Sequence, residues 1–284
     1  MDEHWCTTLV DPLIQPIELC HQLAQDPQLV LLGMTHPLRF RWRHLPSSHP
    51  VWRPQIGQGG GSRLLDAAGF EAWAKGLGIH NHSTVVIWDR RYDASRLWWA
   101  FQRYGKSDVR VLDGGLRAWR CCGLPIERGA VRPALRIPEG TFQSSEGSAF
   151  PTAEIPDVLA SEMNPDVQLW DCRSTAEWQG RRRLRGARKA GRIPWARHLP
   201  WELFRNDRRS DRRFRTREQI QEVIEAFGIN PAKRQLFYCQ SGIRTTVAML
   251  ALARLGWDPC GLSNYDGSWR EWSQSDALPW TMGV

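Results

Sequence analysis

Apolar and polar residues follow one another in blocks along the chain, and the stretch LFYCQSGIRTTVAMLALARLGW at residues 236–257 shows the pattern clearly. The apolar run Leu236–Tyr238 predicts the end of a buried strand. Apolar residues recur at helical spacing from Thr245 to Leu255, which predicts a helix. The residues between them leave room only for a tight loop. We therefore expect Cys239 to lie where a strand passes directly into a helix.

The same order of elements occurs twice in the chain. It is found in VVIWDRRYDASRLWWAFQRYGKSDVRVLDGGLRAW, from residue 85, and in LFYCQSGIRTTVAMLALARLGWDPCGLSNYDGSWREW, from residue 236. Each segment has an apolar strand, a polar loop and a striped helix that ends at a glycine, Gly105 or Gly256. Each then continues through a short strand to Asp-Gly and a tryptophan. A repeat of roughly 120 residues is too long for a solenoid and indicates a duplicated domain.

Short strands alternate with helices in each half, which predicts an α/β fold. We expect tandem duplicated domains, each a mostly parallel central sheet flanked by helices. The Pro-, Gly- and Ser-rich segment 128–151 predicts a linker between a domain at 1–127 and a domain at 152–284. Asp89 occupies the position of Cys239 in the first half, and a carboxylate has no thiol chemistry. We therefore expect domain 1–127 to be inactive and domain 152–284 to be catalytic.

Composition limits the compartment and the cofactors. About 42% of the residues are apolar, and no run approaches the ~20 residues of a membrane span. The acidic start lacks the pattern of a leader peptide, so we expect a cytoplasmic protein. We also expect a monomer. Seven scattered cysteines indicate reduced thiols. We expect all of them except Cys239, Cys6 included, to be structural. No Cys/His spacing suggests zinc, and we expect no metal and no cofactor.

Positive charge is concentrated in one part of the sequence. The net charge is +8, and residues 173–217 contain sixteen Lys and Arg against four acids. A clustered basic patch is typical of nucleic-acid binding, but no recognised nucleic-acid motif accompanies it. We expect a solvated face that attracts a small anion instead.

The chemistry of the second half centres on Cys239. The first amides of the following helix have no intrahelical acceptor, and the positive end of the helix dipole lies beside them. A thiolate at this place is held by those amides, and its pKa falls from the ordinary value of about 8.5. We therefore expect Cys239 to be a nucleophile at the base of an anion-binding loop.

Four motifs follow one another in the second half of the chain: DCRSTAEWQG at 171, AGRIPWARHLPW at 190, YCQSGIRTT at 238 and YDGSWREW at 265. In this order they resemble the two-domain rhodanese family of thiosulfate and mercaptopyruvate sulfurtransferases. The resemblance covers nearly the whole chain. It implies that the Cys239 thiolate takes the outer sulfur of thiosulfate, that sulfite leaves, and that cyanide or a thiol accepts the sulfur from the resulting persulfide.

The resemblance also implies which residues hold the substrate. Besides the catalytic Cys239, the candidate binding residues are Gln240, Ser241, Gly242, Ile243, Arg244, Thr245, Glu177 and Trp269. The loop residues would act mainly through backbone amides, Arg244 on the sulfonate oxygens, and Trp269 as a wall of the pocket. We expect Glu177 to pair with Arg244 and to order the loop, and Asp171 and Arg173 to form a structural ion pair.

Other functions remain open at this point. Cysteine phosphatases use a longer Cys-x5-Arg loop, whereas Arg244 follows Cys239 after only four residues. Mercaptopyruvate enzymes usually show C-G-S-G-V-T where this chain has CQSGIR, and an aspartate where it has Gly33. These departures favour thiosulfate over 3-mercaptopyruvate as the donor. A non-catalytic persulfide carrier that docks a partner protein is the alternative from another class.

Overall fold

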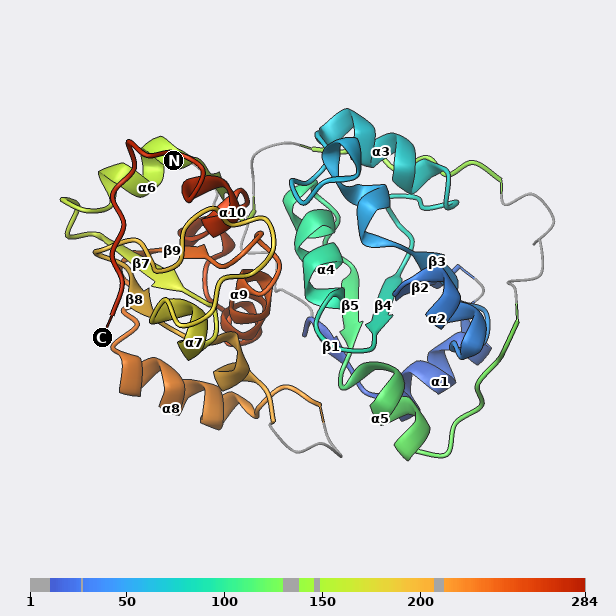
Figure 1. Cartoon of the computed structure of the whole chain (residues 1–284). Coiled ribbons are helices and arrows are strands. Elements are labelled where there is room, and N and C mark those ends of the chain that lie inside the picture. The colour runs from blue at the N-terminus through green and yellow to red at the C-terminus, as the bar shows by residue number, and fades with distance from the viewer. Residues whose placement is uncertain (1–10, 27, 130–137, 146–148, 207–211, 284) are drawn as a thin grey trace, which may run out of the picture.

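Two α/β units lie side by side in the computed structural model (Figure 1). It describes residues 11–26, 28–129, 138–145, 149–206 and 212–283. Cys6 and parts of the expected linker 128–151 lie outside the described residues.

The first unit contains a five-stranded parallel sheet in the order β1-β5-β4-β2-β3. Its strands are β1 (Leu13–Ile14), β2 (Val30–Met34), β3 (His49–Val51), β4 (Val85–Asp89) and β5 (Val109–Leu112). Its α-helices are α1 (Pro16–Gln25), α2 (Pro37–Trp42), α3 (Ala67–Lys75), α4 (Ala94–Arg103) and α5 (Gly115–Cys121). Two short 3-10 helices are η1 (Arg53–Ile56) and η2 (Gln58–Gly60).

The second unit repeats this plan with a parallel sheet in the order β6-β10-β9-β7-β8. Its strands are β6 (Thr152–Ala153), β7 (Val167–Asp171), β8 (Arg197–His198), β9 (Arg234–Tyr238) and β10 (Leu262–Tyr265). Its α-helices are α6 (Ile155–Ala160), α7 (Thr175–Trp178), α8 (Arg217–Phe227), α9 (Thr245–Arg254) and α10 (Ser268–Trp272). The 3-10 helices are η3 (Trp201–Phe204) and η4 (Pro259–Gly261).

The duplication predicted from the sequence is confirmed, since the two strand orders correspond position by position. Side chains repeat as well. Trp119 Nε1 donates to the carbonyl oxygen of Pro125 at 2.7 Å, and Trp272 Nε1 donates to that of Pro279 at 2.9 Å. The expected strand and helix on either side of Cys239 are β9 and α9.

Residues 138–145 of the segment 128–151 pack along the first unit. The Gly140 amide donates to the Lys75 carbonyl at 2.8 Å, and the Phe142 amide donates to the Ile79 carbonyl at 3.0 Å. Phe142 is fully buried among the aromatic residues of α3 and α4. These residues are therefore held against the first unit by hydrogen bonds and by an apolar anchor.

Helices α4 and α9 face each other between the two sheets (Figure 1). Residues 94–102 of α4 and 245–253 of α9 are all buried. A helix whose residues are all buried must be covered on both sides. Each of these helices is covered on one side by its own unit and on the other side by the other unit. Thr246 Oγ1 lies 3.0 Å from Ser95 Oγ across this contact. One apolar core therefore runs through both units.

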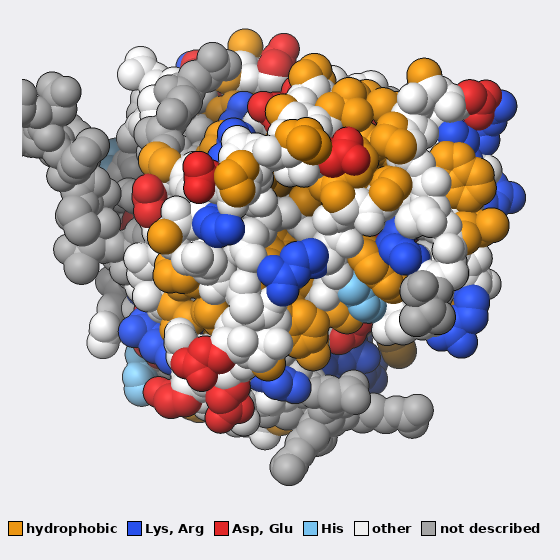
Figure 2. All heavy atoms as spheres, turned by 90° about the vertical axis from the view of Figure 1, so that its left-hand side faces the viewer, with side chains coloured by type: hydrophobic (Ala, Val, Ile, Leu, Met, Phe, Trp, Pro, Cys, Tyr) orange, Lys and Arg blue, Asp and Glu red, His pale blue; other side chains and the backbone are white. Residues whose placement is uncertain are grey.

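Basic residues on the outer face of the second unit are dispersed. In Figure 2, Lys and Arg side chains lie in separate groups among apolar and acidic ones. Arg173 of the basic stretch is buried, whereas Arg181, Arg182 and Arg183 are exposed. Residues 207–211 of that stretch lie outside the described part. None of the helices in the described part is long and apolar enough to cross a membrane.

Candidate active site

Cys239 lies at the carboxyl end of β9, directly before the loop that leads into α9. Its side chain is only 1% exposed. The sulfur accepts hydrogen bonds from the amides of Ser241, Arg244 and Thr245. Burial raises the pKa of the Cys239 thiol, but the Arg244 charge and these amides outweigh burial, so the pKa lies below its ordinary value. We call residues 239–244 the Cys239 loop.

Ser268 holds the Cys239 loop in place from below. Its Oγ accepts hydrogen bonds from the amides of Cys239 at 3.1 Å and of Gly242 at 2.9 Å, and donates to the Tyr265 carbonyl at 2.7 Å. Gly242 has φ +66°, and a Cβ there would overlap with Asp266. The loop therefore needs glycine at this position. The sequence predicted that the Gly242 amide would bind the substrate anion. It donates to Ser268 Oγ instead.

Arg244 and Glu177 form the expected ion pair. The two terminal nitrogens of Arg244 donate to the two carboxylate oxygens of Glu177 at 2.7 and 2.8 Å. Burial raises the pKa of Glu177, yet Arg244 and a hydrogen bond from Ser174 lower it further, so its pKa lies below the ordinary value. The pair is buried, with Glu177 3% and Arg244 11% exposed. Glu177 thus lies buried beside Arg244 and not at the protein surface.

Asp171 and Arg173 form the expected structural ion pair below the Cys239 loop. Arg173 Nη2 lies 2.5 Å from an Asp171 carboxylate oxygen and also donates to the Gly191 carbonyl at 2.8 Å. The Arg173 guanidinium stacks 4.7 Å above the ring of Trp269. Trp269 is 1% exposed and packs in the core of the second unit. The expectation that Trp269 walls the pocket is wrong, because its ring is covered by Arg173.

The remaining expected residues support the loop in different ways. The Gln240 carbonyl accepts from the Arg270 amide at 2.9 Å, and its side chain reaches the Arg185 carbonyl at 3.4 Å. Ile243 is 4% exposed, and its carbonyl accepts from Thr246 Oγ1 at 2.7 Å.

The corresponding loop of the first unit, residues 89–93, is filled by its own carboxylate. We call it the Asp89 loop. Asp89 accepts hydrogen bonds from the amides of Arg91 at 3.0 Å and Ala94 at 2.7 Å. These are the loop and helix amides that an external anion would need. Burial raises the pKa of Asp89 to about 6, against the opposing charge of Arg205 and these amides.

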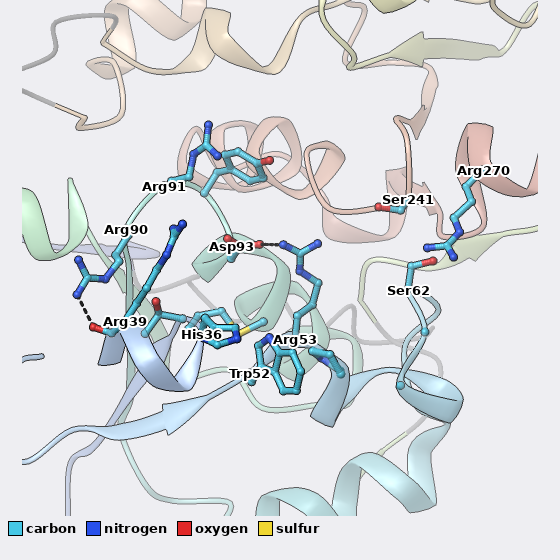
Figure 3. A pocket seen from close by; sticks show the side chains of 16 residues that line it. His36, Arg39, Trp52, Arg53, Ser62, Arg90, Arg91, Asp93, Ser241 and Arg270 are labelled. Carbon is cyan, nitrogen blue, oxygen red and sulfur yellow. Dashed lines mark hydrogen bonds and ion pairs between the residues drawn. The ribbon is translucent and has the colours of Figure 1, made fainter. Parts of the chain in front are cut away.

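A cavity of about 510 Å³ lies between the units and reaches the Cys239 loop. Ser241 and Arg270 are the lining residues from the second unit, and all others come from the first. Figure 3 shows Ser241 and Arg270 on one side, with Arg53 and the Asp89 loop opposite. Trp52 is also among the lining residues. We call this space the interunit cavity.

Sequence reasoning missed the arginines of the interunit cavity. They are Arg39, Arg53, Arg90, Arg91 and Arg270. All but Arg270 lie in the half that was expected to be inactive, far along the chain from Cys239. The one signal available was the RRY run that follows Asp89, at the position where a functional loop would bind an anion.

Comparisons with known proteins point in one direction. The family described as Rhodanese-like domain matches residues 17–121 and 156–275. A thiosulfate sulfurtransferase of Pseudomonas aeruginosa is 31% identical over 273 residues, covering 94% of this chain and 96% of the relative. A 3-mercaptopyruvate sulfurtransferase of Escherichia coli is 30% identical over 207 residues, covering 72% and 69%. The sulfur carrier protein TtuD of Thermus thermophilus is 26% identical over 277 residues, covering 91% and 93%.

Solved structures show the same fold. A complex of an EanB variant with ergothioneine superposes with a TM-score of 0.85 at 23% identity, covering 96% of this chain and 70% of that chain. YnjE superposes with a TM-score of 0.82 at 24% identity, covering 96% and 68%. With two matching domains, two corresponding sheets and relatives of about 30% identity, the chain belongs to the rhodanese family of sulfurtransferases.

Proposed function

We propose that the protein is a thiosulfate sulfurtransferase in which Cys239 carries the sulfur as a persulfide. The observation that carries this proposal is a buried thiol with a lowered pKa, held by three amides at the start of a helix. A lowered pKa increases the fraction of thiolate at any given pH, and the same amides would stabilise the anionic persulfide.

The first half-reaction is a displacement at sulfur. The Cys239 thiolate attacks the outer sulfur of thiosulfate, the S–S bond of thiosulfate breaks, and its electron pair leaves with sulfite. In the second half-reaction an acceptor such as cyanide or a thiol attacks the outer sulfur of the persulfide, and the Cys239 thiolate returns. Splitting the transfer in this way lets one cysteine serve a donor and an acceptor that never meet.

In this proposal Arg244 mainly stabilises the negative charge on the Cys239 sulfur. Both of its terminal nitrogens already donate to Glu177, so the pair holds a positive charge near Cys239 in a fixed position. Arg270 lines the interunit cavity beside Ser241 and is exposed. We propose that Arg270 holds the sulfonate oxygens of thiosulfate, a role that the sequence analysis gave to Arg244.

The two units have different roles in this account. Domain 152–284 is proposed to be catalytic, because it contains Cys239, and domain 1–127 non-catalytic, with 128–151 joining them. The Asp89 carboxylate supports this division, since it already occupies the amides of its own loop.

A two-donor assay tests the proposal. Purified protein is given cyanide with thiosulfate or with 3-mercaptopyruvate, and thiocyanate is measured, with Cys239→Ala as the control. We expect turnover with thiosulfate that disappears in Cys239→Ala. A higher rate with 3-mercaptopyruvate would reassign the donor, and this test is needed because relatives of both kinds are about equally similar. A persulfide without turnover from either donor would favour the carrier function.

A further inference from the structure

Four of the arginines that line the interunit cavity have no acidic partner among the described side chains. Five arginines line it, and Asp93 is the one acidic residue of the lining. Asp93 is already paired with Arg53 at 2.8 Å, as Figure 3 shows. The pKa of Arg90 is lowered by burial and by the like charges of Arg39 and other arginines. An anionic ligand would relieve this repulsion.

The cavity is larger than thiosulfate requires and is partly apolar. Its volume of about 510 Å³ is within the range of pockets that bind organic molecules. Met34, Trp52, Pro54 and Tyr92 supply apolar surface between the arginines. This combination fits an organic molecule with separated anionic groups, since charge and apolar contacts are both offered.

The cavity also reaches the loop that holds the Cys239 sulfur. Ser241 lines it, and the Ser241 amide favours the thiolate of Cys239 by hydrogen bonding. A persulfide places its outer sulfur about 2 Å beyond the cysteine sulfur. A thiol bound in the cavity would therefore lie beside the loop that holds the sulfur it must attack.

The Asp89 loop gives the arginines a fixed position. Asp89 binds the Arg91 amide at 3.0 Å, and Arg90 Nη2 donates to the carbonyls of Arg39 at 2.8 Å and Arg43 at 2.7 Å. These bonds tie the loop to α2, where Arg39 is located. The Asp89 loop thus has an ordered basic edge that lines the cavity.

We propose that the first unit provides the binding site of the sulfur acceptor, and that this acceptor is a thiol bearing at least two carboxylates. Arg39 and Arg91 bind the carboxylates, and the apolar lining contacts the rest of the molecule. The inference deepens the proposed function and rests on it. The acceptor thiolate attacks the outer persulfide sulfur, a new S–S bond forms, and the Cys239–S bond breaks with its electron pair returning to Cys239. The acceptor leaves as a persulfide.

The test isolates the second half-reaction. Cys239 is loaded with sulfur from inorganic polysulfide, excess is removed, and single-turnover transfer is measured to glutathione, a thiol with two carboxylates, and to its diethyl ester. Arg39→Gln and Arg91→Gln are compared with the control Arg41→Gln. Arg41 is exposed and lies on α2, as Arg39 does, but it does not line the cavity. All three sites are exposed, so folding is expected to survive, and circular dichroism checks it.

We expect wild type to prefer glutathione over the diester. Each cavity variant should lose about tenfold in that preference, the size of one charge-assisted hydrogen bond, while Arg41→Gln keeps it. Equal rates for diacid and diester in wild type would overturn the inference, and so would an equal loss in Arg41→Gln. Loading with thiosulfate is measured separately. Failure there would contradict the proposed donor and leave the acceptor test intact.

Discussion

Cys239 is buried, yet its pKa is lowered, and the two facts are reconciled by its neighbours. Removing a thiolate from water favours the neutral thiol, whereas Arg244 and three amide groups favour the anion. Glu177 holds the charged Arg244 in place through the ion pair, so the pair and the thiolate form one electrostatic unit. Both members of the ion pair are therefore expected to affect Cys239.

The titration of Cys239 gives the first prediction. We expect the thiolate absorbance of Cys239, measured as wild type minus Cys239→Ser, to appear with a midpoint below about 8.5, the value of a free thiol. Arg244→Gln should raise the midpoint, because the stabilising charge is lost. Arg244→Lys, which keeps the charge, should recover part of the shift. A midpoint that is the same in wild type and Arg244→Gln would contradict the account.

The ion pair gives the second prediction. Glu177→Gln leaves the Arg244 guanidinium buried without its carboxylate, which should lower the free energy of unfolding in urea by about 3 kcal/mol. Asp276→Asn removes the partner of exposed Arg188 and should cost less than about 1 kcal/mol. If the two variants were equally stable and Glu177→Gln kept full activity, Glu177 would have no role in ordering the loop.

At the scale of elements, one strand–loop–helix unit has been used twice with different results. β4 and β9 end at corresponding positions, and α4 and α9 begin after loops of the same kind. In the second unit the loop amides stabilise the Cys239 thiolate, and in the first they donate to the Asp89 carboxylate. The two loops therefore hold different chemical groups at corresponding positions.

The buried carboxylate of the Asp89 loop gives the third prediction. Its pKa of about 6 lies above the ordinary value of 3.8, so between these values the folded chain holds a proton that the unfolded chain has released. The free energy of unfolding therefore falls as pH rises from about 4 to 6, by roughly 3 kcal/mol for this group. Asp89→Asn should remove this part of the slope. Asp93 and Asp113 also have raised pKa values, so the wild-type minus variant difference is the measurement, and an unchanged slope would contradict the prediction.

The sequence predicted the elements well and the cavity poorly. The apolar run before Cys239 and the helical spacing after it were sufficient for β9 and α9, since both are local patterns. Trp269 was misplaced, because nothing local shows that Arg173, far away in sequence, covers its ring. Arg39 and Arg91 were missed for a related reason, as they line one cavity with Ser241 only through the packing of one unit on the other.

At the scale of the whole molecule, the units are joined by corresponding contacts. Asp266 accepts a hydrogen bond from the Leu64 amide of the first unit at 2.8 Å, and Asp113 accepts one from the Phe214 amide of the second, also at 2.8 Å. Asp113 and Asp266 are the repeated aspartates of the two Asp-Gly pairs. Buried Arg96 of α4 adds an ion pair with Asp266 at 2.5 Å and donates to the Gly242 carbonyl at 3.0 Å. The first unit therefore supports the Cys239 loop directly.

Arg96 gives the fourth prediction. Arg96→Met fills a similar space but leaves Asp266 without its cation, which should cost about 3 to 5 kcal/mol of unfolding free energy. The rate of persulfide formation should fall as well, because the Gly242 carbonyl loses its donor from the first unit. Arg103→Met at the end of the same helix is the matched control and should cost less than about 1 kcal/mol. Equal effects of the two variants would show that Arg96 does not couple the units.

The most direct test of the account is the covalent state of Cys239 after exposure to thiosulfate. The protein is incubated with thiosulfate, desalted and analysed by intact and peptide mass spectrometry, with released sulfite measured in parallel. The account predicts that the Cys239 peptide gains the mass of one sulfur atom, that sulfite is released in equal amount, and that cyanide reverses the gain. An unmodified Cys239, or sulfur on another cysteine, would contradict the central claim.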